Sequence, residues 1–269
     1  MDLNTEIKGQ GYPILCLHGH PGSSASMSVF TNYLSQQYMT ITPDLRGYGK
    51  SQCQQNFAME DHLEDLKELL DKYNIERCLL LGWSLGGIIA MELALLMPDR
   101  FSGTILIATA AKPVSIRTSN TWQDQLFTGI GGIINLIKPG WQWNIDTFGK
   151  RSLFRFLIEN HTPESYNYLA TEGTPAYFQT SKAATKALFD AIGKGYDRLE
   201  DLHQIDCPCL MLSGECDRNI IPQASQKTAE HLPNCYYINY PQVAHLFPWE
   251  IPNRVLRDIQ RWLDAHEFK

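Results

Sequence analysis

The chain has 269 residues, of which 43% are hydrophobic and 19% charged, and its formal net charge is −6. This length and composition predict a globular protein with a large core, either one large α/β domain or a domain with an insertion. The negative charge, together with the lack of any lysine or arginine cluster, excludes a typical nucleic-acid partner.

In its first part the chain alternates short apolar runs with amphipathic segments. Buried strands are expected at residues 14–17, 39–42, 78–81 and 104–108. Helices are expected between them at residues 26–36 and 57–73, and from residue 88 to about residue 97. Strands that are apolar throughout indicate a parallel sheet covered on both faces. The region before Ile14 is short, which suggests that an antiparallel edge strand is missing.

This rhythm stops between residues 112 and 200, where no strand-like run occurs. Helices are expected at 122–138, 145–160 and 181–192, with another that starts at Pro163 behind a Thr162 cap. The many aromatic residues here either fill a helical core or line an apolar pocket, and Trp141 and Trp143, beside Gly140, favour the pocket.

The α/β rhythm then returns, with strands at 209–212 and 235–238 and helices at 223–232 and 252–264. We therefore expect a core made of residues 1–111 and 201–269, with residues 112–200 inserted as a helical cap.

The stretch Gly82-Trp83-Ser84-Leu85-Gly86-Gly87 lies between a buried strand and a helix. It has the form G-x-S-x-G, in which a strained turn raises a serine hydroxyl above the sheet. Gly82 and Gly86 are expected where strand and helix pack too closely for a Cβ atom. Ser84 is therefore the candidate nucleophile.

A serine nucleophile needs a base and an acid that orients the base. In this arrangement both follow the serine along the chain, each just after the carboxyl end of a strand. Asp217 and Glu215 follow the strand at 209–212, and Asp217, which lies further into the loop, is the favoured acid. His245, the histidine that follows the strand at 235–238, is the candidate base.

Two backbone amides are candidates for an oxyanion hole. The N–H of Leu85 lies at the start of a helix, and the loop after the first strand supplies the N–H of His20. The His20 side chain either points into the pocket or occupies a position that accepts many residues. Trp83 and Leu85 flank the nucleophile and are expected to wall the acyl pocket.

Together these segments resemble the α/β-hydrolase superfamily over nearly the whole chain. The resemblance is carried by His18-Gly19-His20-Pro21-Gly22, Asp44-Leu45-Arg46-Gly47-Tyr48-Gly49, the serine turn, Gly214-Glu215-Cys216-Asp217 and His245. It implies a mostly parallel sheet with a helical cap, the roles given above, and a structural role for Asp44 and Arg46. Haloalkane dehalogenases and epoxide hydrolases share the His-Gly-x-Pro form, but their aspartate nucleophile is replaced here by Ser84.

The serine turn is similar to that of small carboxylesterases, so we expect a serine hydrolase acting on a carboxylic ester of a small or medium apolar molecule. A thioester, a carbon–carbon bond or an amide remains an alternative substrate bond, and a ligand receptor with little turnover is an alternative role. No cofactor, metal or membrane partner is implied, and the oligomeric state is open. Seven cysteines without a secretion signal predict a cytoplasmic location.

Overall fold

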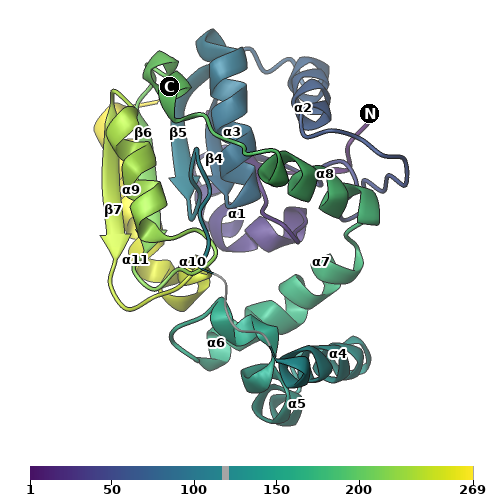
Figure 1. Ribbon diagram of the computed structural model, residues 1–269. Coiled ribbons are helices and arrows are strands. Elements are labelled where there is room, and N and C mark those ends of the chain that lie inside the picture. The colour runs from purple at the N-terminus through teal and green to yellow at the C-terminus, as the bar shows by residue number, and fades with distance from the viewer. Residues whose placement is uncertain (117–120, 269) are drawn as a thin grey trace.

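The computed structural model describes residues 1–116 and 121–268. Within these residues, one sheet has the strand order β1-β3-β2-β4-β5-β6-β7, and Figure 1 labels its strands β4 to β7. Its strands are β1 (Thr5–Lys8), β2 (Pro13–Leu17), β3 (Met39–Pro43), β4 (Cys78–Trp83), β5 (Phe101–Ile107), β6 (Cys209–Gly214) and β7 (Cys235–Tyr240). The pairs from β3 to β7 are all parallel, so the carboxyl ends of β4, β6 and β7 lie along the same edge of the sheet.

The expectation that an antiparallel edge strand is missing is wrong. β1 pairs with β3 in the antiparallel direction, with Thr5 opposite Pro43 and Lys8 opposite Thr40. The strand has four residues and no buried side chain, and Lys8 forms an ion pair with Glu6 at 2.9 Å. A short, charged strand is typical of a sheet edge, and it lacks the apolar run that would have indicated it.

Helices cover both faces of the sheet (Figure 1). The α-helices of the described residues are α1 (Ser28–Leu34), α2 (Asp61–Lys72), α3 (Leu85–Leu96), α4 (Trp122–Ile137), α5 (Gln142–Thr147), α6 (Pro163–Tyr168), α7 (Thr174–Phe178), α8 (Lys182–Gly193), α9 (Pro222–His231), α10 (Phe247–Glu250) and α11 (Pro252–His266). Shorter helical turns are η1 (Ser24–Met27), η2 (Pro98–Arg100), η3 (Gly149–Arg151), η4 (Leu153–Phe156), η5 (Leu169–Gly173) and η6 (Leu199–Gln204).

Strand β4 lies at the centre of the sheet and is buried along its whole length. Cys78 and Leu80 belong to the core cluster that includes α2, α3 and α9. Leu79 and Leu81 belong to the cluster on the opposite face, with α1 and α11. Burial on both faces explains why the strand is apolar at successive positions. The turn that follows β4 therefore emerges from the middle of the fold.

Residues 112–200 contain helices and no strand in the part that the structure describes. The hydroxyls of Thr162 and Ser181 cap α6 and α8 by accepting N–H groups of the first turn, as helix-start residues of this type commonly do. In Figure 1, α4, α5 and α6 lie together at one end of the molecule, and α7 and α8 lead back toward the sheet.

The helix expected over residues 145–160 does not form as one unit. Instead, α5 ends at Thr147, and η3 and η4 follow. Between those two turns, Ser152 donates its hydroxyl to the Gly149 carbonyl at 2.7 Å and accepts the Phe154 N–H at 3.3 Å. A serine that bonds to the nearby backbone competes with regular helix, and this explains the break.

The inserted region contacts the rest of the chain at several places, and one of them joins Arg198 to Glu92 of α3 at 2.8 Å. Leu246 donates its N–H to the Leu157 carbonyl at 2.9 Å, and Tyr168 stacks on Trp249 with ring centroids 4.0 Å apart. Just before α8, Ser181 donates its N–H to the Gly47 carbonyl at 2.8 Å. This last contact holds the start of α8 against the loop that follows β3.

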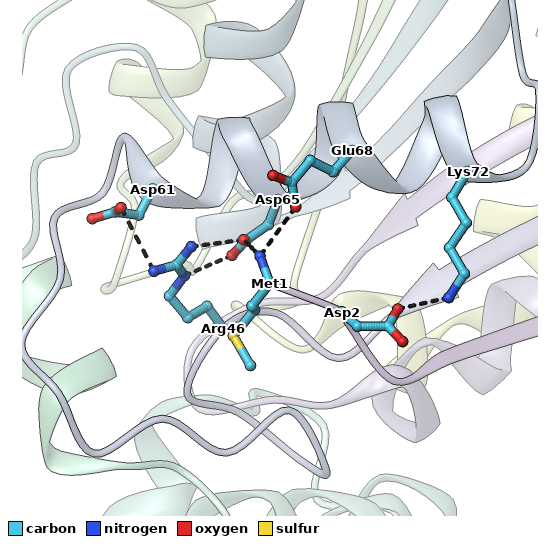
Figure 2. A network of polar contacts seen from close by, with 7 residues as sticks. All are labelled: Met1, Asp2, Arg46, Asp61, Asp65, Glu68 and Lys72. Atoms are coloured by element: carbon cyan, nitrogen blue, oxygen red, sulfur yellow. Dashed lines mark hydrogen bonds and ion pairs between the residues drawn. The ribbon is translucent and has the colours of Figure 1, made fainter.

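A polar network ties that same loop to α2 (Figure 2). Arg46 donates from Nε and Nη2 to the two carboxylate oxygens of Asp65, each at 2.7 Å, and the Asp65 side chain is almost fully buried. Asp61 lies 3.6 Å from the same guanidinium, and the amine of Met1 also contacts Asp65. This two-point contact fixes the loop between β3 and α2, in agreement with a structural role for Arg46.

Candidate active site

Ser84 occupies the turn between β4 and α3 in a strained conformation. Its φ of 54° and ψ of −115° lie outside the regions that a residue with a Cβ atom normally adopts. Hydrogen bonds of the Ser84 backbone hold the turn: its N–H donates to Ile107, and its carbonyl accepts from Gly87 and from the Thr109 hydroxyl, at 2.8 to 2.9 Å, with a longer bond from Ile88 at 3.3 Å. The strain is therefore supported by the surrounding structure.

The glycines on either side of Ser84 are required by close packing. A Cβ atom at Gly86 would lie 2.1 Å from the carbonyl oxygen of Leu17, and one at Gly82 would lie 2.3 Å from the carbonyl oxygen of Gly86. Both neighbours are backbone atoms, which cannot move aside as a flexible side chain could. This close approach is the one expected from the G-x-S-x-G pattern.

Asp217 lies in the loop after β6, and its side chain is buried. Its Oδ1 accepts the N–H groups of Asn219 and Ile220 at 2.8 and 3.0 Å, so the carboxylate is held by its own loop. Its Oδ2 lies 2.7 Å from Nδ1 of His245. Glu215, the alternative acid, instead accepts the N–H of Gln242 at 3.1 Å near the surface.

His245 lies in the loop after β7 and is 4% exposed. Its Nε2 lies 3.1 Å from Oγ of Ser84, so its imidazole lies between the serine and Asp217. The preceding residue, Ala244, donates its N–H to Glu250 at 2.9 Å, and Gly214 leaves room for the backbone at Ala244. These contacts fix the loop that carries the imidazole.

The hydrogen bonds in this chain define what the three side chains can do. Oδ2 of Asp217 accepts the proton on Nδ1 of His245, which leaves Nε2 free to accept the proton of the Ser84 hydroxyl. This arrangement converts a weakly nucleophilic hydroxyl into one that can lose its proton as it attacks.

The loop after β2 approaches the serine closely. A Cβ atom at Gly19 would lie 3.1 Å from the Cβ of Ser84. His18 holds this loop, because its Nε2 accepts the Leu45 N–H at 3.0 Å and its Nδ1 contacts the Gly19 carbonyl at 2.8 Å. Burial lowers the pKa of His18, which keeps the ring neutral and suited to both contacts. His20 follows directly and is joined to Pro21 by a cis peptide bond.

The two amides expected in an oxyanion hole, those of His20 and Leu85, make no backbone hydrogen bond in the described part of the chain. The N–H of Leu85 is at the first position of α3, where a helix leaves its amides without internal partners. Both groups are therefore free to donate to a ligand.

A pocket of about 310 Å³ lies beside Ser84. His20 and Leu85 contribute to its wall, and so do Leu188, Phe189 and Ile192 of α8. Only a weak sequence signal pointed to α8, namely the apolar spacing of Leu188 and Ile192 on one helical face. Nothing in the sequence indicated that this face would meet the serine rather than another helix.

Three aromatic residues expected in the pocket lie elsewhere. Trp83 is buried beneath His245, with ring centroids 5.7 Å apart, and packs edge-on against Trp249 at 4.8 Å. Trp141 and Trp143 pack against each other at 4.9 Å and are 38% and 50% exposed. None of the three lines the pocket beside Ser84.

No group of three or more histidine, cysteine or acidic side chains capable of holding a metal ion occurs among the residues described. None of the helices described here combines the length and the apolar character that crossing a membrane requires.

Comparisons with known proteins agree with this architecture. A family model described as alpha/beta hydrolase fold matches residues 12–252. The chain is 35% identical to a pimeloyl-(acyl-carrier protein) methyl ester esterase of Aliivibrio salmonicida, over 98% of this chain and 97% of that protein. It is 25% identical to 3-oxoadipate enol-lactonase 1 of Acinetobacter baylyi, over 83% of this chain and 78% of that protein.

Among solved structures, a thermophilic esterase from Thermogutta terrifontis matches with a TM-score of 0.73 and 25% identity. The match covers 99% of this chain and 94% of that one. The protein therefore belongs to the α/β-hydrolase fold family, as the sequence resemblance implied.

Proposed function

We propose that the protein is a serine hydrolase that cleaves carboxylic esters through an acyl-enzyme. The observation that carries the proposal is the unbroken chain of contacts from Ser84 through His245 to Asp217, at 3.1 and 2.7 Å. The esterases and the enol-lactonase among its relatives support ester hydrolysis as the reaction class.

In this mechanism, Nε2 of His245 takes the proton of Ser84 as Oγ attacks the ester carbonyl. The N–H groups of His20 and Leu85 donate to the oxygen that becomes negatively charged. The imidazolium, oriented by Asp217, then gives its proton to the departing alcohol. Water then transfers a proton to the same imidazole as it attacks the acyl-enzyme, and that proton passes to Oγ of Ser84 as the Oγ–acyl bond breaks and the carboxylic acid leaves.

The proposal includes three further points that the sequence suggested. Residues 112–200 act as a cap over the site, since α8 of this segment forms a wall of the pocket. The substrate is a small molecule of small or medium size, in keeping with a pocket of about 310 Å³. The protein works in the cytoplasm, where cysteines like the seven free ones described here stay reduced.

Labelling with a fluorophosphonate tests the proposal, because this reagent reacts with an activated serine. Intact mass is compared for the wild-type protein and Ser84→Ala, beside hydrolysis of 4-nitrophenyl esters from acetate to decanoate. We expect one adduct that depends on Ser84, and ester turnover that falls by at least about 10³-fold in the variant. A folded wild-type protein that neither forms the adduct nor hydrolyses any ester would refute the proposal and favour a ligand receptor.

A further inference from the structure

His20 lines the pocket beside Ser84, and among the described residues its ring makes a hydrogen bond through Nδ1 alone. Its Nδ1 lies 2.9 Å from the hydroxyl of Tyr48. Its Nε2 has no hydrogen-bond partner in the residues described. Because this atom is also not one of the unpaired polar atoms that are fully buried, it is accessible from the pocket. The ring also meets the edge of Phe189, with centroids 6.0 Å apart.

The Tyr48 hydroxyl determines which nitrogen of His20 carries the proton. Tyr48 is fully buried, and within the described chain Nδ1 of His20 is the one acceptor that its hydroxyl reaches. If Nδ1 carried the proton, the phenol proton would be buried without an acceptor, which folded proteins avoid. Tyr48 therefore donates to Nδ1, and the proton of the neutral ring is on Nε2.

The charge of the ring is set by its surroundings. Burial, with a smaller contribution from His18, lowers the pKa of His20 to about 4. The aromatic groups packed against the ring are Tyr48, whose pKa burial raises, and Phe189, and neither carries a negative charge that would pair with an imidazolium. At neutral pH the ring therefore offers an uncharged N–H group to the pocket.

Building on the proposed function, we propose that Nε2–H of His20 selects esters that carry a second acceptor oxygen two to four bonds from the carbon of the scissile carbonyl. The backbone N–H of the same residue is a candidate oxyanion donor, so its side chain starts beside the reacting carbonyl and reaches neighbouring atoms. Ile88, Leu188 and Ile192 form apolar parts of the pocket wall, and Ser115 and Asn219 contribute polar groups. An all-carbon ester leaves the Nε2–H without a partner in this setting, whereas an ether or keto oxygen satisfies it.

Two pairs of nearly isosteric esters test the inference. In the acyl half, 4-nitrophenyl methoxyacetate is compared with 4-nitrophenyl butyrate. In the alcohol half, 2-methoxyethyl acetate is compared with butyl acetate. For each pair, the ratio of kcat/KM values is measured in the wild-type protein and in variants, so that differences in the chemical reactivity of the esters cancel between proteins.

We expect His20→Phe to lower the ratio by about fivefold to tenfold for at least one pair, the loss typical of one neutral hydrogen bond. The pair that responds identifies the half of the substrate that carries the acceptor. His20→Gln, which can place a donor at the position of Nε2, should keep the ratio within about twofold of the wild-type value. His203→Phe, a matched change at an exposed histidine, should leave both ratios unchanged.

Nitrogen-15 NMR of the imidazole reads the tautomer without any turnover. We expect the Nε2–H form at pH 7 in the wild-type protein and a mixture of both tautomers in Tyr48→Phe. An Nδ1–H form or an imidazolium in the wild-type protein would overturn the inference. So would ratios that stay unchanged in His20→Phe while all four esters are hydrolysed, and in that case the proposed function survives. If no ester is hydrolysed and Ser84 is not labelled, the proposed function fails and this inference fails with it.

Discussion

Replacing Asp217 with asparagine changes one atom of the catalytic arrangement and leaves its surroundings intact. Oδ1 of Asp217 accepts two N–H groups of its own loop, so an asparagine whose side-chain oxygen takes this place keeps the loop folded. Its NH₂ group then replaces Oδ2, 2.7 Å from Nδ1 of His245. Two donors cannot face each other, so Nδ1 must accept and the imidazole proton moves to Nε2.

That tautomer presents a proton to Ser84 where a base is needed. A triad that loses its base in this way typically has a kcat about 10⁴-fold lower. Because each factor of ten in rate corresponds to about 1.36 kcal/mol, the activation free energy should rise by roughly 5.4 kcal/mol. The melting temperature should change little, because both backbone hydrogen bonds of the loop remain.

Steady-state hydrolysis of a 4-nitrophenyl ester measures the loss, with the active protein normalised by thermal unfolding. The matched control is Glu215→Gln, which alters the neighbouring acid, a residue that bonds to Gln242 and not to His245. We expect that variant to stay within about threefold of the wild-type kcat, in line with the small effect of most surface substitutions. An equal loss in both variants, or a loss in Glu215→Gln alone, would refute the assignment of Asp217 as the orienting acid.

Two further predictions concern stability. Arg46→Met removes the guanidinium that bonds to both oxygens of the buried Asp65 carboxylate, and it should lower the free energy of unfolding in urea by about 3 kcal/mol. Adding Asp65→Leu should recover part of that loss. An unchanged unfolding midpoint in Arg46→Met would show that this network does not stabilise the fold. Burial lowers the pKa of His62 in the folded state from 6.5 to about 4. Between pH 6.5 and pH 4 the unfolded state therefore binds more protons at His62 than the folded state does. The free energy of unfolding should accordingly fall as the pH falls through this range, by up to about 1.4 kcal/mol per pH unit. His62→Phe should flatten this dependence in urea unfolding at pH 4.5, 5.5 and 6.5, and an unaltered slope would contradict the reasoning.

The central strands could be predicted because burial on both faces leaves an apolar run, as in Cys78-Leu79-Leu80-Leu81. Strand β1 could not, because an edge strand with Glu6 and Lys8 has no such run and is defined only by its pairing with β3. The break between α5 and α6 was missed for a related reason. The segment has no strand-like apolar run, so a helix is expected, but the hydrogen bonds of Ser152 interrupt it.

The candidate site shows the same division. Ser84, Asp217 and His245 could be placed from their positions after strands, because parallel strands bring their carboxyl ends to one edge. The pocket could not be predicted, because its wall depends on how α8 packs against the sheet domain. This packing is determined by the surfaces of both parts together, and the sequence of α8 alone does not reveal it. Trp141 and Trp143 illustrate this limit, since their place in a loop said nothing about the distance of that loop from Ser84.

The strand order has a consequence for how this protein is made. Ser84 and His245 are 161 residues apart in the chain and meet only because β5, β6 and β7 have been added to the sheet beyond β4. In the proposed mechanism, the serine is therefore synthesised long before its base, and its hydroxyl has no activating partner until the chain after β7 has folded. Reactivity of Ser84 toward a fluorophosphonate can then report the moment at which a newly made chain finishes folding.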